Sequence, residues 1–105
     1  MTFAEYQRRA HALAFYPENR AIEYVALKLA GEAGEVAEKV GKMIRDGMPD
    51  NFPAEIAKEL GDVLWYVQEM AGLNGYTLQD IADINVQKLE SRKARGVLSG
   101  SGDNR

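Results

Sequence analysis

Apolar residues recur every three or four positions along most of this chain, which is the spacing of one face of an α-helix. Four stretches carry the pattern: residues 2–15, 20–45, 53–73 and 77–94. No stretch alternates apolar and polar residues between turn signals, as a half-buried β-strand does. The sequence therefore predicts an all-α fold, with four helices in one domain that spans residues 1–95.

Capping residues support the expected helix starts. Thr2 followed by Glu5, and Thr77 followed by Asp80, are spaced as capping boxes, in which each side chain satisfies a free backbone N–H of the first turn. After the last helix, residues 96–105 are rich in glycine and serine, and we expect them to form a flexible tail. Glycine or proline separates the helical stretches at Pro17, Gly47, Pro53, Gly75 and Gly96.

Two of the predicted helices each carry two acidic residues three positions apart, Glu32 with Glu35 and Glu59 with Asp62. Residues at that spacing are neighbours on a helix surface. Glu32 also falls within the apolar stripe of its helix, where an unpaired carboxylate is costly to bury. Four carboxylates on facing helices repel one another unless a cation joins them, and oxygen ligands favour Mg²⁺ or Mn²⁺ over zinc. The alternative is that all four acids are solvated surface charge.

Glycines interrupt the same two helices at Gly31, Gly34, Gly41 and Gly61. A glycine in a helix interior costs roughly 0.5–1 kcal/mol relative to alanine. We therefore expect helices to approach one another closely at these positions, through tight packing alone or around the acids.

The last predicted helix places Asn85, Lys88 and Arg92 on one arc that also contains Ile81. This arrangement predicts that the three polar side chains point inward. Arginine binds phosphate in a fork, lysine acts on it as a point charge, and asparagine bonds sugar or phosphate oxygen. Beside a metal site, the arc is typical of polyphosphate chemistry. The alternative is a network of ion pairs that holds the helices together.

Other side chains carry weaker signals. Trp65 and Tyr66 are suited to stack on a base, although such aromatic residues are more often core or interface anchors. His11 is the only histidine, so a histidine-rich metal site is excluded, and we expect it to be structural or exposed.

Composition narrows the class of protein. The chain has 105 residues, of which 46% are hydrophobic and 28% charged, with a formal net charge of -3. These values fit one globular domain. No run of apolar residues is long enough to span a membrane. The negative net charge lacks the basic excess that is typical of proteins that bind nucleic-acid polymers. Cysteine is absent, which excludes disulfides and thiolate chemistry. No signal peptide is present, which favours the cytoplasm.

These motifs together resemble the MazG-type nucleotide pyrophosphohydrolases. Glu32-Ala-Gly-Glu35, 23 intervening residues and Glu59-Leu-Gly-Asp62 are similar to the ExxE…ExxD signature of that family. The downstream Asn85-x-x-Lys88-x-x-x-Arg92 resembles a further motif of the same all-α superfamily. The resemblance covers residues 20–105.

The resemblance implies a four-helix protomer that completes its bundle as a homodimer or homotetramer. It implies Mg²⁺-dependent hydrolysis, with Mn²⁺ as a substitute, of a nucleoside triphosphate to the monophosphate and pyrophosphate, as in the clearing of unwanted nucleotides from the cellular pool. The implied catalytic metal ligands are Glu32, Glu35, Glu59 and Asp62, and the implied substrate contacts are Asn85, Lys88 and Arg92. The resemblance does not indicate which nucleotide is used, because this chain has a single such unit, unlike the two-unit members of the family.

Two other functions fit the same residues. One is a catalytically silent helical module that senses nucleotides, and the other is a structural bundle with acidic surfaces. Metal binding separates the structural bundle from the other two functions, and turnover separates the enzyme from the sensor.

Overall fold

The computed structural model describes residues 1–105. It contains α1 (Phe3–His11), a short 3-10 helix η1 (Glu18–Arg20), α2 (Ala21–Asp46), α3 (Phe52–Leu73) and α4 (Leu78–Ala94), and it has no strand. The predicted all-α fold of four helices is confirmed.

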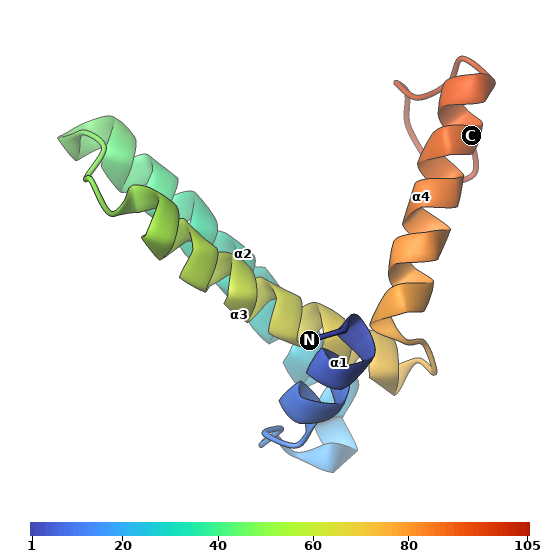
Figure 1. Ribbon diagram of the computed structural model, residues 1–105, viewed down its shortest axis with the longest axis horizontal. Coiled ribbons are helices and arrows are strands. Elements are labelled where there is room, and N and C mark those ends of the chain that lie inside the picture. The colour runs from blue at the N-terminus through green and yellow to red at the C-terminus, as the bar shows by residue number, and fades with distance from the viewer.

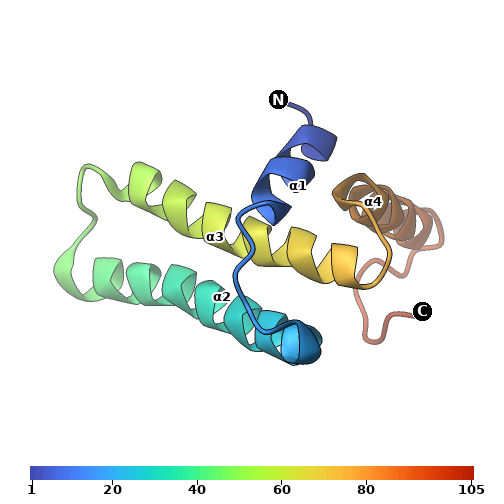
Figure 2. The ribbon, with the colours of Figure 1, turned by 90° about the horizontal axis from the view of Figure 1, so that it is seen from below.

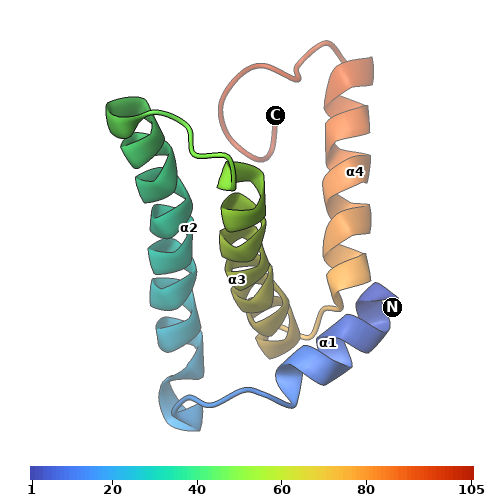
Figure 3. The same ribbon diagram turned by 60° about the vertical axis from the view of Figure 1, so that its left-hand side comes forward.

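Helices α2 and α3 form a long antiparallel hairpin, the largest packed unit of the molecule (Figures 1 and 3). The hairpin turns at Gly47, whose φ of 90° favours a residue without a side chain. The expected close approach at the helical glycines is wrong within one chain. A Cβ built at Gly31, Gly34, Gly41 or Gly61 meets nothing within 4 Å.

Helix α1 is shorter than the sequence pattern predicts. The pattern extends to residue 15, whereas the helix ends at His11. The backbone turns there through two hydrogen bonds between residues three apart. The Leu13 N–H donates to the Ala10 carbonyl, and the Ala14 N–H donates to the His11 carbonyl. Helix α1 ends early because of its contacts with α3. His11 and Tyr16 both bond to α3, so the chain must turn between them.

Helix α4 leaves the hairpin at a sharp turn and diverges from it (Figures 1 and 2). Gly75, with φ of 81°, makes the turn, and Thr77 and Asp80 form both halves of the predicted capping box. The Leu78 N–H donates to Gln7 Oε1 at 2.9 Å, which ties the start of α4 to α1. Helix α4 contacts α1 and α3 but not α2.

The chain is open for its size. Only eight residues are buried, and the accessible surface is 7647 Å². A compact monomer of this mass exposes about 5,800 Å². The radius of gyration is 16.5 Å, whereas about 13 Å is typical of a compact domain of this length. Much of the apolar surface of the helices therefore has no partner within one chain. None of the helices combines the length and the apolar composition needed to cross a bilayer.

Candidate functional site

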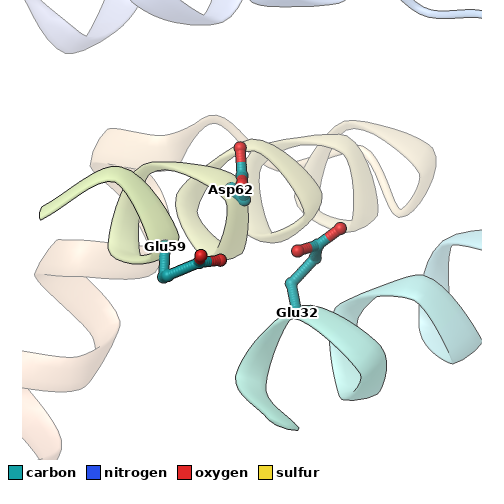
Figure 4. A group of neighbouring side chains, drawn as sticks. All are labelled: Glu32, Glu59 and Asp62. Carbon is teal, nitrogen blue, oxygen red and sulfur yellow. The ribbon is translucent and has the colours of Figure 1, made fainter. Parts of the chain in front are cut away.

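Three acidic side chains converge where α2 faces α3. Glu32 extends from α2 toward Glu59 and Asp62 on α3 (Figure 4). One carboxylate oxygen from each of the three lies within 4.8 Å of the others. Glu32 and Glu59 are half-buried and Asp62 is exposed. The antiparallel packing of the two helices thus joins one residue of the first acidic pair with both residues of the second.

This group has the donor chemistry of a site for a hard divalent cation. All three donors are carboxylate oxygens, which Mg²⁺ and Mn²⁺ prefer. Two oxygens on opposite sides of a Mg²⁺ ion lie about 4 Å apart, because each Mg–O distance is about 2.0–2.1 Å. The observed separations are at most 4.8 Å, so small side-chain rotations are enough to bring the three carboxylates within reach of one ion.

Glu35 is the one predicted metal ligand that lies outside this group. It is exposed on α2, one helical turn beyond Glu32. It is not among the residues whose carboxylate oxygens all lie within 4.8 Å of one another.

Lys39 adds a cation that the sequence analysis missed. It lies on α2 one turn beyond Glu35, and its Nζ is 3.8 Å from Glu59 and 3.5 Å from Glu55 on α3. The sequence did contain a signal for this contact. Lys39 follows Glu32 by seven residues and therefore lies on the same helix face. One side of the acidic group is thus partly neutralised by the protein itself.

A cavity of about 360 Å³ adjoins the acidic group. Trp65 and Tyr66 of α3 line it together with two apolar side chains of the α1–η1 loop and two of the acids, in full Leu13, Phe15, Glu32, Asp62, Trp65 and Tyr66. Burial raises the pKa of the Tyr66 hydroxyl, and the charges of the two acids raise it further while Lys28 opposes them. Tyr66 therefore remains a neutral hydrogen-bond donor beside the acids. The cavity combines an acidic side with an aromatic side.

The structure does not bring Asn85, Lys88 and Arg92 to the acids of the same chain. Asn85 is exposed on α4, which has no contact with α2. Lys88 Nζ lies 3.4 Å from Asp103 of the tail. The buried Arg92 guanidinium donates to the Asp103 carbonyl at 2.8 Å and reaches the Asp103 carboxylate at 3.4 Å. Bonds to these two cations lower the pKa of Asp103.

The last ten residues therefore fold back along α4. Arg105 donates to the carbonyls of Val97 and Leu98 at 3.0 and 2.9 Å, and Arg95 donates to the Arg105 carbonyl at 2.7 Å. The expected flexibility of this tail stays a prediction. Its contacts place an acidic residue on the two cations that the sequence assigned to substrate.

A buried carboxylate, Glu69 of α3, forms a second polar cluster. Its side chain is 1% exposed and accepts hydrogen bonds from His11 Nδ1 at 3.0 Å, from Gln68 Nε2 at 2.8 Å and from the Tyr16 hydroxyl. Burial and then the bond to Glu69 raise the pKa of Tyr16 to about 12. Tyr16 also stacks on Tyr24 of α2, with ring centroids 5.8 Å apart. The sequence predicted that His11 is structural or exposed, and it is both, because its side chain bonds to Glu69 and is 70% exposed. Glu69 was not among the residues that the sequence analysis named.

Comparison with known proteins identifies the family of most of this chain. The sequence profile of the MazG nucleotide pyrophosphohydrolase domain matches residues 20–97. Gene 37 protein of Mycobacterium phage L5 is 41% identical over 109 residues, which cover 95% of this chain and 96% of the phage protein. No solved structure matches the chain. The matched domain contains all seven residues that the sequence analysis assigned to metal or substrate, whereas α1 and the loop after it precede it.

We expect Tyr16 to ionise about two pH units later than a free tyrosine, whose pKa is near 10. The folded chain favours the neutral hydroxyl, so its contribution to stability is complete below pH 10 and is lost as the pH rises toward 12. Absorbance at 295 nm, recorded for the wild type and for Tyr16→Phe, isolates this one of the five tyrosines. A difference curve centred near pH 10, with helicity retained, would contradict the buried bond to Glu69.

Proposed function

The chain belongs to the MazG nucleotide pyrophosphohydrolase family, and on that premise we propose that it hydrolyses a ribo- or deoxyribonucleoside triphosphate to the monophosphate and pyrophosphate. The observation that carries the proposal is the convergence of Glu32, Glu59 and Asp62 on one small volume. The proposed role is to clear unwanted nucleotides from the pool. The cytoplasmic location expected from the sequence belongs to this proposal, because nucleoside triphosphates are made and used there.

Members of this family generally use divalent metal ions. We propose that Glu32, Glu59 and Asp62 hold Mg²⁺, with Mn²⁺ as a substitute. A divalent ion at this position neutralises phosphate charge and makes bound water more acidic. The three carboxylates also fix which side of the α2–α3 hairpin the phosphates approach.

Glu35 is the acid we assign to the attacking water. Its carboxylate lies outside the group of three, one turn along the same helix, so it is available to accept a proton. In the proposed reaction, the water oxygen bonds to the α-phosphorus and one water proton passes to Glu35. The bond between the α-phosphorus and the bridging oxygen breaks, and pyrophosphate leaves with the bonding electrons.

Asn85, Lys88 and Arg92 remain the proposed substrate contacts. The two cations are suited to stabilise the charge that develops on the leaving pyrophosphate. Asp103 now bonds to both cations, and its side chain is 84% exposed, so a polyphosphate of higher charge is able to displace it. The acids and these residues lie on arms that diverge within one chain, so a complete site needs them brought together.

We propose that a homodimer or homotetramer brings them together. The chain exposes about 1,800 Å² more surface than a compact monomer of its mass, whereas a standard interface buries about 800 Å² per partner. Exposed apolar side chains occur on all three long helices, among them Ile22, Leu27, Leu60, Ile84, Val86 and Leu89. A second copy packed on these faces covers them and is able to supply α4 to the acids of its partner.

Mg²⁺ or Mn²⁺ is expected to raise the melting temperature of the chain. A ligand at a hundred times its dissociation constant stabilises the folded state by about 2.7 kcal/mol, which corresponds to ~10 °C or more for a domain of this size. Thermal unfolding should show this increment for the wild type and for Glu35→Gln, and should show none for Glu59→Gln or Asp62→Asn. Glu38→Gln, an exposed acid on the same helix as Glu35, is the matched control. An increment that survives in both Glu59→Gln and Asp62→Asn would mean that these acids are only surface charge.

Turnover with Mg²⁺ across ribo-, deoxyribo- and modified nucleoside triphosphates is expected to give a monophosphate and pyrophosphate. In ¹⁸O-labelled water the label should enter the monophosphate, because the attack is on the α-phosphorus. Glu35→Gln should abolish turnover while the metal increment persists, and Lys88→Ala should lower kcat/KM by about 10²–10³.

Release of orthophosphate with a diphosphate would contradict the proposed reaction. Binding of metal and nucleotide without turnover of any substrate would assign the chain to nucleotide sensing.

The purified chain is expected to sediment as a dimer or tetramer at micromolar concentration. Val86→Glu should lower the mass, because it places a charge on an exposed apolar position of α4. Gln87→Glu adds the same charge at the next position, whose side chain points about 100° away around the helix, and should leave the mass unchanged. A stable 11.6 kDa wild-type monomer would contradict assembly.

A further inference from the structure

Glu69 holds both ends of the loop between α1 and η1. His11, the last residue of α1, bonds to Glu69 Oε2 at 3.0 Å, and Tyr16, at the far end of the loop, donates to Glu69 Oε1. The Trp65 Nε1–H also donates to the carbonyl of Ala10 at 3.1 Å. The loop is therefore anchored to α3 before and after its tip, and the same buried carboxylate bonds to both ends.

The tip of this loop carries two apolar side chains that no other part of the chain covers. Leu13 is 77% exposed and Phe15 is 96% exposed. Both line the cavity of about 360 Å³ that contains Glu32 and Asp62. Because packing does not hold these side chains, the anchors of the loop decide where they lie.

Glu69 lies two helical turns from Asp62, on the same side of α3. It follows Asp62 by seven residues, which is a rise of about 10 Å along the same helix face. The loop spans this interval, from its anchor at Glu69 to its tip beside Asp62. A carboxylate that does not touch the acidic group thus determines the shape of the cavity next to it.

We propose that Glu69 is a positioning residue of the nucleotide site: by binding both ends of the loop, it holds Leu13 and Phe15 as an apolar wall against which the nucleoside of the substrate packs. The phosphates of the same substrate then reach Glu32 and Asp62 across the cavity. The proposal rests on the proposed function and adds the part of the site that recognises the nucleoside. This wall precedes the region that matches the family profile.

A merely structural Glu69 and a positioning Glu69 have different effects on binding. A structural role changes the stability of the fold and leaves nucleotide binding alone. A positioning role weakens a ligand that has a nucleoside and spares one that has only phosphates. Trp65, the only tryptophan of the chain, lines the cavity and reports binding by its fluorescence.

The test is a titration of the full chain, in Mn²⁺, with an α,β-methylene nucleoside triphosphate and with inorganic tripolyphosphate. The principal variant is Tyr16→Phe, which removes the bond to Glu69 but keeps the ring that stacks on Tyr24. It should raise the Kd of the nucleotide analogue at least tenfold and change that of tripolyphosphate less than twofold. Phe15→Ala should do the same, and Glu69→Gln, which keeps one acceptor oxygen, should have a smaller effect than Glu69→Ala.

Gln7→Ala is the matched control, because Gln7 ties α1 to α4 at a point away from the loop. It should lower the melting temperature and leave both dissociation constants unchanged. If Glu69→Ala fails to fold, Tyr16→Phe and Phe15→Ala decide the question.

Four outcomes overturn the inference. Tyr16→Phe and Phe15→Ala leave nucleotide binding unchanged, or they change the binding of the two ligands equally. Alternatively, the variants lower the oligomer mass and weaken the binding of both ligands, or the wild type binds neither ligand. A wild type that binds the analogue in a Tyr16-dependent way but hydrolyses no nucleotide supports the inference while it contradicts the proposed function.

Discussion

The packing of α2 against α3 is the constraint on which the rest of this structure depends. It is the most extensive contact in a chain that buries only eight residues. Its register brings Glu32 opposite Glu59 and Asp62, so the element that holds the fold together also assembles three repelling charges. Holding like charges close together at a main packing surface is costly. The divalent cation proposed for this position would offset the repulsion, which Lys39 already offsets in part.

The sequence predicted the helices well because their signals are local. Apolar spacing and the Thr77–Asp80 capping box lie within single segments, and the structure contains both. The convergence of the acids was also foreseeable, since an i, i+3 pair on each of two facing helices leaves few other arrangements. The position of Glu35 outside the group was not foreseeable, because it depends on how α2 is rotated about its own axis against α3.

Interactions between distant residues account for the rest of what the sequence did not predict. Glu69 reads as one more acid on a helix, yet it binds residues more than fifty positions away and ends α1 earlier than the pattern implies. Likewise, Lys88 and Arg92 were expected to face the acids. The tail that bonds to them instead is glycine- and serine-rich, and its composition gives no indication of such contacts. Helix periodicity identifies which residues share a face, but it does not identify what covers that face.

Lys39 has a consequence for the proposed metal site. Its ammonium lies 3.8 Å from Glu59, so the carboxylate already has a partner before any divalent ion arrives. An incoming ion must compete with a tethered cation whose local concentration is fixed and which cannot diffuse away. The affinity of the proposed site would then be lower than three carboxylates alone would give, and the lysine would assist release of the ion by taking its place. Lys39 is thus a built-in counterion of the acidic group, and at the proposed metal site it would favour rapid exchange of the ion over permanent retention.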